Sequence, residues 1–221
     1  MIVAVIPVKE LTRGKQRLQP LLTAAERHLL SRTMLEDVLS VVAICPLLDR
    51  VLVITSDAEA AAYARQYGAG VIKEVRQLRQ SQSVDAAATI CGQMGAEGML
   101  TLPLDVPRVT LNDLTRIVEK GTSSPGIVLV PSRDELGTNA VLARPSGAIP
   151  FRFGYDSFRA HRREAEARGL PCEVCDLPNL ALDIDEIDDL RCFLQQPGQT
   201  RTHDLLRRLE IDGRLDVAKD A

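Results

Sequence analysis

Asp105 is the acidic residue whose position in this chain is most informative. It lies between Pro103 and Pro107, just after the apolar run 99–102, which is typical of a buried strand. Parallel sheets bind ligands just beyond the carboxyl ends of their strands, so a carboxylate here can hold a divalent cation against nucleotide phosphates. Aspartate beside proline is also common in ordinary turns. The segment alone predicts either a metal ligand or a turn cap.

A second acidic cluster lies late in the chain, at residues 182–189. Asp183 and Asp185 are two residues apart, so on an extended segment both carboxylates point to the same side. That arrangement suits a hard cation such as magnesium. Asp188 and Asp189 are better interpreted as the negatively charged start of a helix. We therefore expect Asp183 and Asp185 to be ligands and the other two to be solvated.

A basic loop follows the first apolar run of the chain, residues 2–6. It carries four cations within nine residues: Lys9, Arg13, Lys15 and Arg17. Lysines act as point charges and arginine offers a planar fork, so the loop could neutralise a triphosphate. A solvated basic turn would have the same composition. The loop is not a Walker phosphate loop, and the chain has no dinucleotide-binding glycine fingerprint.

Two glycine-containing segments could form a cradle for a small anion. One holds Thr138 and Asn139 after Gly137, and the other runs from Gly154 to Ser157. Glycine with hydroxyl and amide neighbours suits anion binding, and backbone amides would add to it if Ser157 begins a helix. Two ordinary turns are the alternative. The histidines indicate no base: His161 follows one turn into that helix, and His28 and His203 are expected on helix surfaces.

The elements that must position these residues alternate along the chain. Apolar runs predict strands at 2–6, 51–55, 70–72, 99–102, 126–131 and 139–143, and short extended pieces at 173–177 and 180–183. An antiparallel pairing of 126–131 with 139–143 is one option. Helices are predicted from the Thr23 capping box to before Pro46, and at 57–68, 83–96, 110–119, 157–169, 185–195 and 202–210. This alternation predicts one α/β domain over residues 1–221, with a mostly parallel central sheet flanked by helices.

Composition excludes several classes of function. The net charge of −3 and the 3% aromatic content, without tryptophan, give no reason to expect nucleic-acid binding. No apolar stretch is long enough for a membrane helix, and the amino terminus enters a strand directly, so we expect a cytoplasmic protein that does not bind membranes. The five cysteines are expected to be reduced, and Cys172 and Cys175 receive no function because no second pair matches them.

Together, these segments resemble the 2-phospholactate guanylyltransferase family of coenzyme factor 420 biosynthesis. The resemblance rests on motifs in family order across almost the whole chain: 6–9 with 15–18, 102–107, 137–140, Phe153-Gly154 with Ser157 and His161, and 182–185 with Asp189-Leu190. It implies a nucleotidyltransferase fold of the glycosyltransferase-A type. It also implies a reaction of GTP with 2-phospho-L-lactate, phosphoenolpyruvate or 3-phospho-D-glycerate that releases pyrophosphate.

The resemblance also implies roles for individual residues. Asp105, Asp183 and Asp185 would bind two magnesium ions, and the acid would be held by Thr138, Asn139, Gly154 and Ser157. The nucleotide would be held by Pro7, Val8, Lys9, Lys15 and Arg17. Where the family often has glycine-leucine-asparagine, this chain has Ser83-Val84-Asp85 after Gln82. Ser83 and Asp85 still offer a hydroxyl and an acceptor to guanine.

Two other classes of function remain open at this point. A molybdopterin or sugar-phosphate nucleotidyltransferase would share the fold, but such enzymes typically carry a glycine-rich loop where this chain has Pro7-Val8-Lys9. A noncatalytic nucleotide-binding protein would not need carboxylates in two separate segments. The identity of the acid depends on pocket walls that the sequence does not define. The apolar content of 45% leaves room for a homodimer surface.

Overall fold

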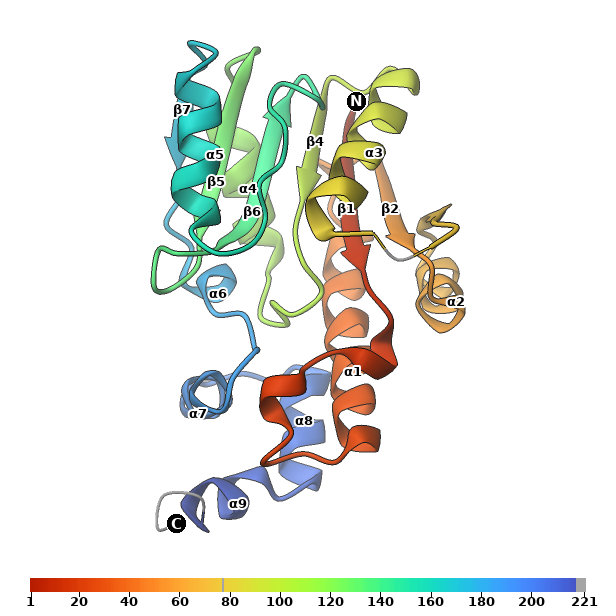
Figure 1. Ribbon diagram of the computed structural model, residues 1–221, viewed down its shortest axis with the longest axis vertical. Helices are drawn as coiled ribbons and strands as arrows, with labels where there is room; N and C mark the ends of the chain where they lie inside the picture. The colour runs from red at the N-terminus through yellow and green to blue at the C-terminus, as the bar shows by residue number, and fades with distance from the viewer. Residues whose placement is uncertain (77, 218–221) are drawn as a thin grey trace.

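The computed structural model describes residues 1–76 and 78–217 as an α/β fold (Figure 1). Within these residues, one sheet has the strand order β3-β2-β1-β4-β6-β5-β7. Only β6 runs antiparallel to its two neighbours, so the expectation of a mostly parallel sheet with an antiparallel pair is confirmed. The strands are β1 (Ile2–Val8), β2 (Arg50–Thr55), β3 (Gly70–Lys73), β4 (Gly98–Thr101), β5 (Gly126–Pro131), β6 (Thr138–Arg144) and β7 (Cys172–Val174).

Helices cover both faces of this sheet, which is why β1 is apolar at every position. Ala4 and Ile6 face a core shared with α1, α2 and α4, whereas Val3 and Val5 face a core shared with α3 and α5. The helices are α1 (Ala24–Val42), α2 (Ala58–Gln66), α3 (Gln80–Gln93), α4 (Leu111–Lys120), α5 (Ser157–Glu166), α6 (Pro178–Ala181), α7 (Ile187–Gln195), α8 (Arg201–Arg208) and α9 (Ile211–Val217). None of them, within the described residues, is long and apolar enough to cross a membrane.

A third core lies beyond the carboxyl ends of the strands. There, α7, α8 and α9 pack against the amino-terminal half of α1 and against a short 3₁₀ helix, η2 (Gln16–Leu18) (Figure 1). A second 3₁₀ helix, η1 (Leu11–Arg13), contributes Leu11 to the core shared with α1, α2 and α4. The buried side chains of this core come from segments at both ends of the chain, such as Leu18 and Phe193. The basic loop and the late acidic segment are therefore brought to the same edge of the sheet.

Two predictions about the last third of the chain are wrong. Residues 180–183 were expected to be extended, but Leu180 and Ala181 close the short helix α6, which Pro178 begins with its fixed φ. His203 was expected on a helix surface, but it is 2% exposed and stacks on Phe193 with ring centroids 4.0 Å apart. Packing of α8 against the rest of the molecule buries that face. His28, by contrast, is partly exposed on α1.

Asp37 attaches α8 to α1. Its buried carboxylate accepts the backbone N–H groups of Arg201 and Thr202, at 3.0 and 2.9 Å, and the Thr202 hydroxyl at 2.7 Å. These donors lie in the first turn of α8, where the backbone amides have no partner within the helix. One side chain therefore satisfies the start of a helix that is distant in sequence.

Replacing Asp37 with alanine should lower the free energy of unfolding by about 2–4 kcal/mol, because buried donors would lose a charged acceptor. Urea denaturation of the full chain measures this change. Asp204→Ala is the matched control, since Asp204 is 66% exposed and forms a surface ion pair with Arg207. Its replacement should cost about 0.5 kcal/mol or less. Equal unfolding midpoints for the two variants would contradict the role of Asp37.

Candidate active site

Three carboxylates meet at the carboxyl edge of the sheet. Asp105 comes from the loop after β4, and Asp183 and Asp185 come from the extended segment between α6 and α7. One oxygen of each lies within 4.8 Å of the others. The backbone explains the convergence: the Ile184 N–H donates to the Asp105 carbonyl at 3.0 Å, and the Ile184 side chain is buried. Because side chains alternate along this extended segment, the carboxylates of Asp183 and Asp185 then both point towards Asp105.

Lys15 places its ammonium group between two of these carboxylates. Its Nζ lies 2.6 Å from Asp105 Oδ2 and 2.6 Å from Asp185 Oδ1, and its side chain is only 6% exposed. Its backbone is left-handed, with φ of 56°. Burial alone would lower the pKa of Lys15, but attraction to Asp105 and Asp185 outweighs it and raises that pKa above its ordinary value. Lys15 is therefore a permanent cation within the acidic cluster.

The carboxylates themselves titrate differently. Burial and the negative charge of Asp105 raise the pKa of Asp183 to about 6, against a hydrogen bond from Asn139 that acts in the other direction. Burial would also raise the pKa of Asp185, but the adjacent Lys15 outweighs it and lowers that pKa. Repulsion among the carboxylates therefore raises mainly the pKa of Asp183, which has no lysine contact among the described residues.

The cluster fits a divalent cation by its own chemistry. Three carboxylates outnumber the one ammonium group between them, and carboxylate oxygens are the ligands that magnesium prefers. Within the described part of the chain, Asp105 Oδ1 is buried without a hydrogen-bond partner. An unpaired buried carboxylate oxygen is costly unless a cation or donor meets it. The residues present therefore fit a metal site.

Asn139, predicted to contact the substrate, lies beside the acidic cluster. It is buried, and its Nδ2 donates to the Leu180 carbonyl at 2.8 Å and to Asp183 Oδ1 at 3.0 Å. In this structure its amide fixes the orientation of a predicted metal ligand. A direct contact of Asn139 with substrate stays a prediction.

The predicted anion cradle is brought together by β6 and α5. Ser157 is the first residue of α5, as expected, and its Oγ donates to Thr138 Oγ1 at 3.2 Å. Both hydroxyls are buried, and Gly154 supplies a turn with φ of 130° that a side chain would strain. The N–H groups of Ser157 and Phe158 donate to the carbonyls of Gly154 and Leu136, so the start of α5 adds mainly the positive end of the helix dipole.

The fold places the four cations of the basic loop in different surroundings. Lys9 follows Pro7 and Val8 at the carboxyl end of β1. Burial raises the pKa of Asp185, whereas Lys15, then Arg17 and Lys9, lower it. Arg17 is 72% exposed and pairs with Glu186 at 2.7 Å. Arg13 is 82% exposed and pairs with Glu10. Of the four cations, Lys15 alone is held within the carboxylate cluster of the described chain.

Ser83 and Asp85, predicted to contact guanine, bond within the protein. Ser83 Oγ donates to Glu74 Oε1 at 2.6 Å, and Asp85 accepts the Phe151 N–H at 2.9 Å. Glu74 is a buried carboxylate that the sequence reasoning missed. The signal was available, since Glu74 directly follows β3 and so lies at the same strand edge as Asp105.

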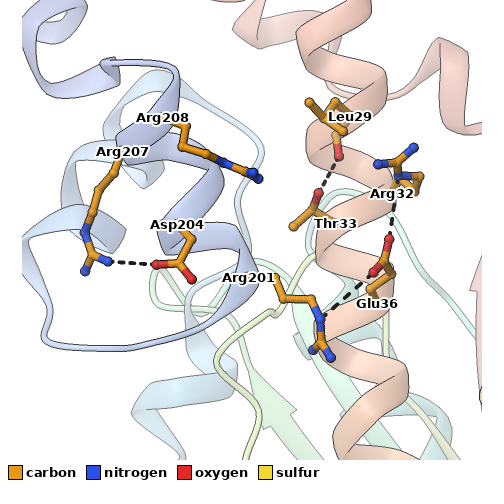
Figure 2. A pocket seen from close by; sticks show the side chains of 8 residues that line it. All are labelled: Leu29, Arg32, Thr33, Glu36, Arg201, Asp204, Arg207 and Arg208. Carbon is orange, nitrogen blue, oxygen red and sulfur yellow. Dashed lines mark hydrogen bonds and ion pairs between the residues drawn. The ribbon is translucent and has the colours of Figure 1, made fainter.

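A cavity of about 560 Å³ lies elsewhere, between α1 and α8 (Figure 2). Its arginines are largely paired with acids: Arg207 with Asp204 at 3.0 Å, and Arg201 with Glu36 at 4.0 Å. None of the predicted site residues lines it. The cavity therefore receives no part in the chemistry of the carboxylate cluster.

Proteins of known sequence resemble this chain over most of its length. It is 38% identical over 207 residues to a phosphoenolpyruvate guanylyltransferase of Roseiflexus sp. (strain RS-1), covering 94% of this chain and 91% of that protein. It is 37% identical over 186 residues to a 3-phospho-D-glycerate guanylyltransferase of Colwellia psychrerythraea, covering 84% and 88%. It is 33% identical over 208 residues to a 2-phospho-L-lactate guanylyltransferase of Methanothermobacter thermautotrophicus, covering 94% and 91%.

Solved structures of other proteins share this fold. A solved structure from Desulfovibrio desulfuricans G20, described as a nucleotide-diphospho-sugar transferase, superposes with a TM-score of 0.78 at 15% identity, covering 97% of this chain and 96% of that one. This likeness confirms the expected nucleotidyltransferase fold. The model of the family described as "Guanylyl transferase CofC like" matches residues 2–220, and the chain therefore belongs to that family.

Proposed function

We propose that this protein is a guanylyltransferase that joins GTP to a three-carbon phosphorylated acid and releases pyrophosphate, in the biosynthesis of coenzyme factor 420. The observation that carries the proposal is the meeting of Asp105, Asp183, Asp185 and Lys15 at one edge of the sheet. Family membership and the names of the relatives support guanylyl transfer. The acid is 2-phospho-L-lactate, phosphoenolpyruvate or 3-phospho-D-glycerate.

In this proposal the chain supplies charge and position. Asp105, Asp183 and Asp185 would hold magnesium, which when bound would neutralise phosphate charge and align the reacting groups. Lys15 lies within the carboxylate cluster, with Lys9 and Arg17 at the edge of that cluster, and all three would face the triphosphate. These cations are needed because the two reacting molecules are both anions.

The reaction needs little covalent help from the protein. A phosphate oxygen of the acid attacks the α-phosphorus of GTP, the bond to the β-phosphate breaks, and pyrophosphate leaves with that electron pair. The attacking group is already anionic, so no side chain has to remove a proton. Thr138 and Ser157, at the positive end of the α5 dipole, hold the acid in line for this attack.

Three finer points belong to the proposal. Dependence on magnesium follows from the carboxylate cluster. A cytoplasmic location is supported by the small metabolic substrates and by the cysteines, which form no disulfide among the described residues. A homodimer is compatible with exposed apolar side chains such as Ile44 and Leu47, and light scattering after size-exclusion chromatography measures it.

Pyrophosphate should appear when the protein meets GTP, magnesium and one of the three acids, each tested separately. A coupled pyrophosphate assay measures turnover and ranks the acids. The matched controls omit the acid, replace GTP with CTP, or add EDTA. Absence of turnover with all three acids would overturn the proposal, and turnover without acid would indicate a different reaction. Comparable rates with CTP would favour another nucleotidyltransferase of the same fold.

A further inference from the structure

Thr138, Ser157 and His161 form a buried chain of hydrogen bonds. His161 Nδ1 lies 3.1 Å from Thr138 Oγ1, and Ser157 Oγ lies 3.2 Å from the same oxygen. The three residues are 5%, 2% and 0% exposed, respectively. Water therefore has little access to these contacts, and the protein itself must set the direction of each hydrogen bond.

The direction is set by the other ring nitrogen of His161. Its Nε2 accepts the backbone N–H of Arg152 at 2.9 Å, so this nitrogen carries no proton. Burial lowers the pKa of His161 to about 4, and the ring is therefore neutral near pH 7. A neutral imidazole with a bare Nε2 has its proton on Nδ1. Nδ1 is consequently a donor, and its hydrogen is shared by Thr138 Oγ1, 3.1 Å away, and the backbone of Ser157.

The donated proton determines what Thr138 can do. A hydroxyl has two acceptor positions and one donor hydrogen. Because Nδ1 of His161 carries a hydrogen, it cannot accept from Thr138, and the Ser157 hydroxyl donates to Thr138, which leaves the Thr138 hydrogen to be donated elsewhere. If the Ser157 contact ran the other way, the hydrogen of Ser157 would be the one left over. In either case one buried hydroxyl proton must meet an acceptor outside the triad.

We propose that His161 is a positioning residue for the acid substrate: it fixes the Thr138–Ser157 pair as a hydrogen-bond donor to an anionic oxygen of that acid. The inference rests on the proposed function, which places the acid at this pair. His161 touches neither substrate nor metal in this account. Phe153 holds its ring edge-on at 5.0 Å between centroids, so the imidazole cannot turn freely.

Two amide substitutions separate the roles of the two ring nitrogens. The shorter side chain in His161→Asn can place an N–H donor near the Nδ1 position. The longer one in His161→Gln can place an acceptor near Nε2 but offers Thr138 no donor. We expect His161→Gln to raise KM for the acid about 10- to 100-fold with KM for GTP little changed, and His161→Asn to recover most of that loss. His28→Gln, on the surface of α1, is the matched control.

A merely structural role gives a different pattern. If His161→Gln and His161→Asn raise KM for both substrates together, or if neither raises KM for the acid, the inference is wrong. Nitrogen NMR of the wild-type protein gives an independent test, since the chain has three histidines and the His161→Gln spectrum identifies the signal of His161. A proton on Nε2 of His161 would overturn the inference, whether or not the wild-type protein turns over any of the acids. Failure of the wild-type protein to turn over any of the three acids would instead overturn the proposed function.

Discussion

Asp105→Asn should lower turnover by about 10³-fold or more while leaving the fold intact. Asparagine has the same shape as aspartate, and its carbonyl oxygen can still accept from Lys15, which now lies 2.6 Å from Oδ2. What is lost is the negative charge and the unpartnered oxygen Oδ1, where the proposal places a metal ion. Steady-state pyrophosphate release, with circular dichroism to confirm folding, measures the effect.

Asp188→Asn provides the matched control for this substitution. Asp188 belongs to the same acidic cluster of the sequence, but it is 76% exposed and pairs with Arg191 on α7. Its replacement should leave turnover unchanged. Wild-type rates in Asp105→Asn would remove the metal role of Asp105. A large loss in Asp188→Asn would instead show that the division of this cluster into ligands and helix-start residues is mistaken.

Lys15→Met should have two effects of opposite sign. Turnover should fall by about 10²- to 10³-fold, because a cation that faces the triphosphate is lost. Binding of a divalent cation in the absence of nucleotide should become tighter. The Lys15 ammonium bridges Asp105 and Asp185 and so competes for the oxygens that the cation needs. Manganese, followed by electron paramagnetic resonance or calorimetry, is the probe.

Arg13→Met controls for a general change of charge in the same loop. Arg13 is 82% exposed and lies outside the carboxylate cluster, so both turnover and manganese affinity should stay close to wild type. Weaker manganese binding in Lys15→Met would mean that the lysine assembles the metal site and does not compete with it. Unchanged turnover in that variant would remove Lys15 from the proposed nucleotide contacts.

The framework of the site could be predicted because it follows from local patterns. Strand ends locate Asp105, and a spacing of two residues on extended chain locates Asp183 and Asp185 on one side. The place of Lys15 could not be predicted. It depends on a left-handed backbone at Lys15 and on the helices of the carboxyl-terminal third packing back onto α1.

Contacts between distant elements account for what the sequence could not show. Ser83 donates its hydroxyl hydrogen to Glu74, which directly follows β3, and its contact with guanine stays a prediction. His203 was expected at the surface, but Phe193 covers its ring. In both cases the partner lies in another element, and which elements meet is determined by tertiary packing. Sequence periodicity identifies which face of an element is buried only when that face is continuously apolar.

The hydrogen bond from Ile184 to the Asp105 carbonyl has a consequence for the order in which the enzyme becomes competent during synthesis. The strands β1 to β6 are all complete by Arg144, so a nascent chain already contains Asp105 and the residues of the basic loop at that stage. Two of the three carboxylates emerge from the ribosome much later, at Asp183 and Asp185. A ribosome-bound or prematurely released chain therefore presents cations and one carboxylate without the set that could hold a metal. Under the proposed function, consumption of GTP would then require a nearly complete polypeptide.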